Sequence, residues 1–215
     1  MTFQDDELYR DITGFARATP AWTQHTVEVW TEAGILVFGA LFVVAWWRAR
    51  HGDARAFAIA ALAPVATALA YTGSELLKSG FTEERPCRAV PGAVPSLAEC
   101  PPTGDWSFPS NHATIAGASA VALVLVRRAL VWLTAPLALL MAFSRVFVGV
   151  HYPHDVAAGL LLGAVAAAVA VRLGTRPATR LAEAMRASGA PAARWLSGPG
   201  PAAPAAVYVG SHRRR

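Results

Sequence analysis

The sequence contains few charged residues for its length. Of 215 residues, 15% are charged and 54% are hydrophobic, whereas about a quarter of a typical soluble domain is charged. Acidic residues are fewest, with 14 Asp and Glu against 19 Lys and Arg. This composition argues against an ordinary soluble domain and indicates a protein embedded in a membrane.

Cysteine is also scarce, since Cys87 and Cys100 are the only two. Two cysteines are too few for a disulfide-stapled fold, and their spacing forms no C-x-x-C metal or redox motif. Both fall in one polar segment of the chain. A disulfide between them would close a short loop in an oxidising compartment, and we favour that pairing over two free thiols.

The N-terminus lacks a basic stretch followed by an apolar core, so we expect no cleavable signal peptide. In residues 1–32, Leu8, Ile12 and Phe15 recur at helical spacing among charged residues. This pattern predicts an amphipathic helix in the membrane interface. An ordinary soluble helix and a loose tail are the alternatives.

Long apolar stretches follow, and a spanning helix needs about 17–25 residues. We place five of them at residues 33–47, 56–77, 112–126, 129–150 and 156–173. The sequence therefore predicts an all-α integral-membrane bundle with about five transmembrane helices in a core of residues 33–173. Gly159 and Gly163 form a small-xxx-small pair that permits close helix packing. Residues 174–215, rich in Arg, Ala and Pro, are predicted to be mostly disordered, with a short helix near 178–187.

Basic residues gather on one side of this bundle. The loop 48–55, the turn at Arg127 and Arg128, and the end of the last apolar stretch with its tail hold 13 of the 19 basic residues. The positive-inside rule assigns this side to the cytoplasm. The net charge of +5 is thereby explained as a topology signal. We expect no nucleic-acid binding, because no basic patch is interleaved with aromatic residues.

Polar residues that an apolar bundle does not require gather at the opposite side. They end the second stretch, begin the third and join the fourth to the fifth. They are Lys78, Arg85, Ser110, Asn111, His112, Arg145, His151 and Asp155. Cations, Arg forks and the free N–H groups of a helix start suit a phosphate. A phosphate site at the interface indicates a lipid whose tails stay in the bilayer.

The chemistry of these side chains predicts their roles. His151 is the expected nucleophile, with Asp155 orienting its ring. His112 is the expected general acid, while Ser110 and the backbone of Asn111 would hold phosphate oxygens. Each has a simpler alternative: Lys78 as a snorkelling lysine, Ser110 as a helix cap, His112 as an interface residue. A metal site of His151, His154 and Asp155 is disfavoured by the nearby cations, so we expect no cofactor.

Together these residues resemble the type 2 phosphatidic acid phosphatase family, which includes vanadium-dependent haloperoxidases. Its K-x6-R-P motif is matched by Lys78, Arg85 and Pro86, and its P-S-G-H motif by Pro109, Ser110 and His112. Its S-R-x5-H-x3-D motif is matched by Ser144, Arg145, His151 and Asp155. The resemblance implies Lys78, Arg85 and Arg145 as phosphate ligands and the same roles for the histidines.

The chain departs from the family pattern at two points. Asn111 replaces the usual glycine; its N–H remains available, but its side chain would narrow the pocket. The membrane enzymes of the family often have six spans, whereas five are predicted here.

The sequence predicts a metal-independent lipid phosphatase of the cell membrane, acting through a phosphohistidine at the outer face. Candidate substrates are a polyprenyl diphosphate, phosphatidate and phosphatidylglycerol phosphate. A phosphotransferase using the same phosphohistidine is one alternative. A non-catalytic protein that binds or transports a lipid phosphate is another. Haloperoxidase chemistry is disfavoured by the membrane setting, and the oligomeric state is not predicted.

Overall fold

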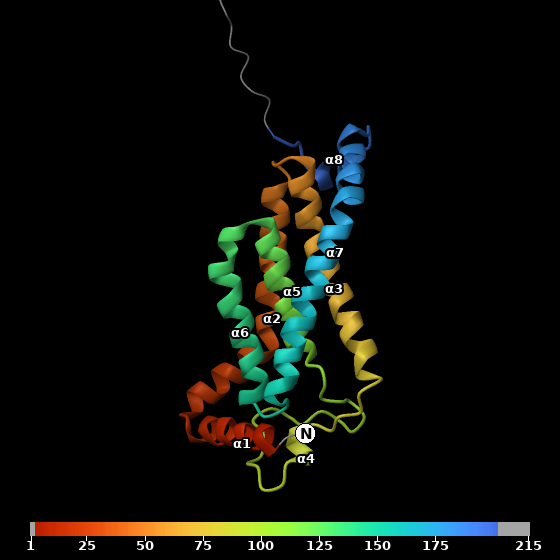
Figure 1. Cartoon of the computed structure of the whole chain (residues 1–215). Helices are drawn as coiled ribbons and strands as arrows, with labels where there is room; N and C mark the ends of the chain where they lie inside the picture. Colours follow the sequence, from red (N-terminus) through yellow and green to blue (C-terminus); the bar gives the residue numbers. More distant parts are fainter. Residues whose placement is uncertain (1–2, 202–215) are drawn as a thin grey trace, which may run out of the picture.

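The computed structural model describes residues 3–201, and this part of the chain is helical with no strand (Figure 1). The prediction of an all-α membrane bundle is confirmed. The elements in chain order are α1 (Phe3–Ala18), α2 (Ala21–Ala49), α3 (Ala54–Lys78), α4 (Pro86–Ala89), α5 (Asn111–Val126), η1 (Arg128–Leu130), α6 (Val131–Phe147), α7 (Pro153–Ala187) and α8 (Pro191–Ser197).

Four helical segments within residues 3–201 are long and apolar enough to cross a membrane: α2, α3, η1 with α6, and α7. The fifth, α5, has 16 residues and is also apolar. It lies at the centre of the bundle and packs against α3, α6 and α7. Small residues line most of its surface, and Ala113, Ala116 and Ala122 are completely buried. The predicted count of about five spans therefore holds.

Helices α5 and α7 approach each other closely because glycines lie between them. A methyl group on Gly163 would overlap the carbonyl oxygen of Thr114, and one on Gly117 would overlap that of Leu160. Gly159 in turn lies against the carbonyl of Ser110. This contact sets the start of α5 beside the start of α7, where the predicted site residues lie.

Helix α1 lies across one end of the bundle rather than along it (Figure 1). Tyr9 is fully buried and donates a hydrogen bond of 2.9 Å to the carbonyl of Gly149. Arg17 donates to the carbonyl of Pro95 at 2.8 Å. Helix α1 therefore covers the loops at this end of the bundle.

The structure differs from the predicted boundary at residue 32, because α2 already begins at Ala21. The sequence between Ala21 and Glu32 is too polar to be recognised by hydropathy. Its polar side chains have partners in the fold: Thr31 and Glu32 both bind Arg145. A helix can extend through polar residues when its neighbours satisfy them.

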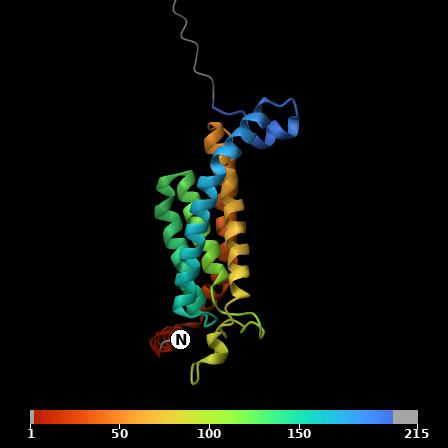
Figure 2. The same cartoon turned by 45° about the vertical axis from the view of Figure 1, so that its right-hand side comes forward.

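The structure also differs in the tail, since α7 continues to Ala187 and α8 follows it (Figure 2). Arg186 donates to the carbonyls of Gly52 and Ser197, each at 3.0 Å. The Arg50 guanidinium stacks 4.5 Å from the ring of Trp47 and 5.2 Å from that of Trp195. The helix predicted near residues 178–187 is present as the last part of α7, and helix also replaces the expected disorder at residues 174–177 and 191–197. Residues 202–215 of the predicted tail lie outside the described residues.

Candidate functional site

The three sequence motifs meet at the end of the bundle covered by α1. A long loop, residues 79–110, folds over this end and is fixed at several points. Cys87 and Cys100 are joined as a disulfide within it, and Leu97 donates a backbone hydrogen bond of 2.9 Å to Val148. The residues predicted from distant parts of the sequence thus line one region.

His151 lies at the centre of this region, on the short loop between α6 and α7. Its side chain is 2% exposed, and its Nδ1 lies 3.2 Å from Oδ2 of Asp155. On the other side of the ring, Nε2 lies 3.2 Å from Nη1 of Arg85. An arginine can only donate, so Nε2 accepts, and the proton is assigned to Nδ1. The unprotonated nitrogen therefore faces the cations.

Asp155 is held in place by the first turn of α7. Pro153 begins the helix, and Oδ2 of Asp155 accepts a hydrogen bond of 2.8 Å from the backbone N–H of Tyr152. Ser107 donates a short hydrogen bond to the same oxygen. The carboxylate is fully buried. Its position is thus fixed before any substrate binds, which orients the ring of His151.

Arg85 and Lys78 share a carboxylate that the sequence did not identify. Arg85 bonds to Oδ1 of Asp105 at 2.9 Å and to its carbonyl at 2.8 Å, and Lys78 lies 3.3 Å from Oδ1. Burial raises the pKa of Asp105, but the hydrogen bond and charge of Arg85 and the charge of Lys78 outweigh it, so the pKa is lowered. The side chain of Asp105 is 45% exposed. An anion thus already occupies part of the predicted phosphate site.

Arg145 is buried at 6% exposure and reaches α2. Its Nη1 donates to Oγ1 of Thr31 at 3.0 Å and pairs with Oε1 of Glu32 at 3.1 Å. Its Nε has no hydrogen-bond partner among the described residues. These contacts offset the cost of a charge near an apolar helix end, and they leave the buried Nε–H of the guanidinium without an acceptor among the described residues.

The start of α5 contributes Ser110, Asn111 and His112. Ser110 is the N-cap of α5 as predicted, but its hydroxyl is buried and unbonded within the described structure. The Asn111 side chain accepts from Ser74 at 2.7 Å and donates to Glu75, so it turns toward α3 and does not narrow the pocket as expected. No described non-glycine residue has a positive φ, so Asn111 needs no glycine-like backbone.

His112 makes no side-chain hydrogen bond to another residue in the described range. It is partly exposed, and the charges of Arg145, Lys78 and Arg85 act on it. Its ring is therefore free to exchange a proton with a group bound among these cations.

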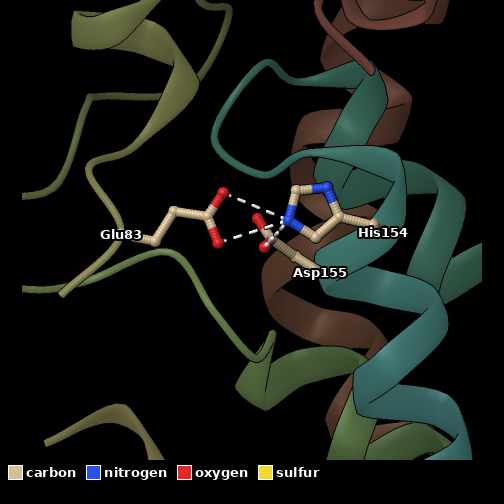
Figure 3. A group of neighbouring side chains, drawn as sticks. All are labelled: Glu83, His154 and Asp155. Carbon is tan, nitrogen blue, oxygen red and sulfur yellow. Dashed lines mark hydrogen bonds and ion pairs between the residues drawn. The ribbon is translucent and has the colours of Figure 1, made fainter. Parts of the chain in front are cut away.

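A second cluster, formed by His154, Glu83 and Asp155, lies next to His151 in the chain (Figure 3). Nε2 of His154 lies 3.1 Å from Oε1 of Glu83 and 3.3 Å from Oδ1 of Asp155. One nitrogen and two carboxylates can hold a divalent cation, and all three ligand atoms lie within 4.8 Å of one another. This cluster differs from the one considered from the sequence, because Glu83 takes the place of His151 in it. In this arrangement His154 connects the long loop to α7 through its contact with Glu83. It also contacts Oδ1 of Asp155, whereas His151 contacts Oδ2.

The environment of His151 predicts a pH-dependent stability. Burial, followed by the charges of Arg85 and Arg145, holds the pKa of His151 well below its usual value near 6.5. Below pH 6.5 the unfolded chain binds a proton that the folded protein excludes, so this stability is complete above pH 6.5 and falls as pH drops toward the folded pKa. We expect a loss of at most about 1.4 kcal/mol per pH unit.

The measurement is the melting temperature in detergent between pH 7.5 and pH 5. His151→Gln removes the titrating ring and is expected to flatten the curve in this interval. Parallel curves for the two proteins would show that the buried ring of His151 does not exclude the proton.

Comparison with known proteins identifies relatives of this arrangement. Residues 59–177 match the family model of the PAP2 superfamily. The chain is 40% identical over 93 residues to an undecaprenyl-diphosphatase of Sulfolobus acidocaldarius, covering 42% of the chain and 45% of that protein. It is 27% identical over 159 residues to the undecaprenyl-diphosphatase BcrC of Bacillus subtilis, covering 74% and 78%.

Among solved structures, the fold is similar to that of LpxE from Aquifex aeolicus. The TM-score is 0.61 at 22% sequence identity, over 77% of this chain and 93% of that one. At this identity the likeness concerns the fold alone. The chain spans about half the length of the Sulfolobus relative.

Proposed function

Because this chain belongs to the PAP2 superfamily and is a membrane phosphatase, we propose that it hydrolyses a lipid diphosphate through a phosphohistidine on His151. One observation supports this most strongly. The Nδ1 of His151 is bound to a buried carboxylate while Nε2 faces Arg85 at 3.2 Å. A ring that only bound phosphate would not require an oriented, unprotonated nitrogen next to a cation.

The proposed first step breaks the phosphorus–oxygen bond to the leaving group. Nε2 of His151 forms a bond to phosphorus, and His112 gives a proton to the departing oxygen of the lipid phosphate. The ring of His151 becomes positive, and Asp155 stabilises this charge. The cations Lys78, Arg85 and Arg145 bind the phosphoryl oxygens, with the unbonded hydroxyl of Ser110 as a further donor.

In the second step a water molecule attacks phosphorus. His112, now neutral, takes a proton from this water, and the bond from phosphorus to Nε2 breaks. Inorganic phosphate leaves, and His151 returns to its starting state. The residues thus supply nucleophile, acid, base and charge without a further group.

The proposed substrate is a polyprenyl diphosphate. This rests on the two relatives, both of which are undecaprenyl-diphosphatases. We place the site at the outer face of the cell membrane and residues 174–215 in the cytoplasm, since the arginines of the opposite end follow the positive-inside rule. Phosphatidate and phosphatidylglycerol phosphate are the competing substrates.

The test is phosphate release by the purified protein in detergent with EDTA. Undecaprenyl diphosphate, phosphatidate and phosphatidylglycerol phosphate are compared at equal mole fraction. We expect the diphosphate to have a kcat/KM at least about tenfold above the others, a preference of about 1.4 kcal/mol. A quench with labelled substrate should leave acid-labile, alkali-stable label on the protein.

Three outcomes would contradict the proposal. Phosphate release that requires a metal ion would contradict the mechanism. A higher kcat/KM for phosphatidate or phosphatidylglycerol phosphate than for undecaprenyl diphosphate would contradict the proposed substrate. Label that passes to an added alcohol in place of water would identify a phosphotransferase.

A further inference from the structure

A basic pocket lies at the end of the bundle opposite His151. It is a cavity of about 690 Å³ between α3, α5, η1 and α7. Four arginines line it, namely Arg55, Arg128, Arg172 and Arg176. We call this cavity the basic pocket. Its remaining wall is mainly apolar and includes Ile59, Leu125 and Val171. None of these residues belongs to the catalytic site.

The four arginines have no internal counter-charge. No Asp or Glu lines the cavity. None of the four side chains forms a hydrogen bond or an ion pair with any residue in the described range 3–201. Arg172 and Arg176 are also four residues apart on α7, where like charges destabilise a helix. Lys78, Arg85, Arg88 and Arg145, by contrast, each pair with a carboxylate. Arg48, Arg127, Arg180 and Arg194 also form no side-chain hydrogen bond or ion pair among the described residues, so the four arginines are distinguished by lining one cavity.

Two of these arginines lie where a cation is least favourable. Arg55 is the second residue of α3, and Arg128 is the first of η1, which leads into α6. The N-terminal ends of helices have a partial positive charge and free N–H groups. Asp53 caps α3 by accepting from the N–H of Ala56 at 2.7 Å, so it is already used. An anion in the cavity would offset both the helix ends and the guanidinium groups.

The apolar wall indicates what this anion is attached to. Leu125 is 36% exposed at the end of α5, whereas Ile59 and Val171 belong to the buried core. The α3 and α7 helices extend further at this end of the bundle than the turn that joins α5 to α6 (Figure 1). Parts of α3 and α7 therefore rise beyond this turn. All these helices are apolar enough to lie in the bilayer. The cavity is therefore placed near the level of lipid headgroups on this side of the membrane.

We propose that the basic pocket binds the headgroup phosphate of an anionic phospholipid, with an acyl chain lying along Leu125. Arginine forks bind phosphate oxygens in pairs, and basic pockets between transmembrane helices suit anionic headgroups. The lipid is a ligand of this leaflet and not a substrate, because His151 lies at the other end of the bundle. The site does not depend on the proposed reaction.

The test measures lipid binding to the full chain in detergent by native mass spectrometry. Phosphatidylglycerol and phosphatidylcholine with the same acyl chains are titrated separately. We expect wild-type protein to retain phosphatidylglycerol preferentially, and Arg55→Gln/Arg172→Gln to bind it about tenfold to thirtyfold more weakly. The control Arg180→Gln/Arg194→Gln removes the same charge from the same end of the bundle and is expected to bind phosphatidylglycerol as the wild type does.

Melting temperatures without added lipid verify that both double variants fold. If the first does not, Arg172→Gln alone is used, with a smaller expected loss. If the control double variant bound phosphatidylglycerol as weakly as Arg55→Gln/Arg172→Gln does, binding would depend on overall charge and not on the pocket. This result would overturn the proposal. So would equal retention of the two lipids. The melting temperature is also measured with phosphatidylglycerol and with inorganic phosphate. An equal rise with the two ligands would assign the pocket to a soluble anion and overturn the lipid assignment.

Discussion

Replacing His151 with alanine is expected to reduce phosphate release by about 10³-fold or more, as removal of a nucleophile does in other enzymes. The variant loses the ring nitrogen that faces Arg85, in an imidazole that Asp155 orients through its other nitrogen. Substrate binding should change little, because Lys78, Arg85 and Arg145 remain. The measurement is kcat and KM for undecaprenyl diphosphate in detergent with EDTA. The effect is expected in kcat.

The matched control is His154→Ala, which removes a neighbouring imidazole from the same turn of the chain. His154 contacts Glu83 and Asp155 rather than the cations, so it acts on the reaction through Asp155. We expect a loss between about tenfold and a hundredfold, as for residues that orient a functional group. His151→Ala retaining more than a tenth of wild-type kcat would contradict the nucleophile assignment.

Substituting Gly163 with alanine is expected to lower stability by about 3 kcal/mol, at the upper end of overpacking effects. The added methyl group would overlap the carbonyl oxygen of Thr114 and lie 2.8 Å from the amide nitrogen of Ala118. Both are backbone atoms, so α5 and α7 must move apart. The melting temperature should fall by about 6–12 °C. Activity should fall too, because this contact sets His112 relative to His151.

Gly39→Ala is the control for the same chemical change. Gly39 lies in α2, and nothing is within 4 Å of its added methyl group. Alanine favours the helix over glycine by up to about 1 kcal/mol, so this variant should be as stable as the wild type or slightly more stable. Equal destabilisation by both substitutions would show that close approach of α5 and α7 does not determine stability.

The sequence predicted the spans because apolar runs of membrane length are a direct consequence of the bilayer. It predicted a short helix near residues 178–187, but it did not predict that α2 begins at Ala21 or that α7 runs without a break to Ala187. Hydropathy reports burial in lipid, whereas these extensions are polar and are stabilised by partners elsewhere in the fold. Glu32 depends on Arg145, and Arg186 depends on carbonyls of the loop after α2.

The candidate site was predictable where a residue type is unusual for its position, as with Arg145 or His151. Asp105, Ser107 and Thr31 were missed, since aspartate, serine and threonine are ordinary in loops and helix ends. Only the fold shows that Ser107 bonds to Asp155 and that Asp105 lies between Lys78 and Arg85. For Asp105 and Ser107, a position within a few residues of the motif at Pro109 was the available signal. Thr31 lies far from every motif and had none.

The position of Asp105 has a consequence for selectivity among anions. Its carboxylate is tethered to the chain, so it competes for Lys78 and Arg85 at a high effective concentration, of the order of millimolar for a flexible link. A monovalent anion from solution offers no more charge than this carboxylate and must also lose its freedom of movement. A diphosphate offers more charge and more oxygen atoms, and it can also engage Arg145. We therefore expect monovalent anions to inhibit phosphate release only weakly, because the carboxylate of Asp105 already occupies the position beside Lys78 and Arg85 that they would take.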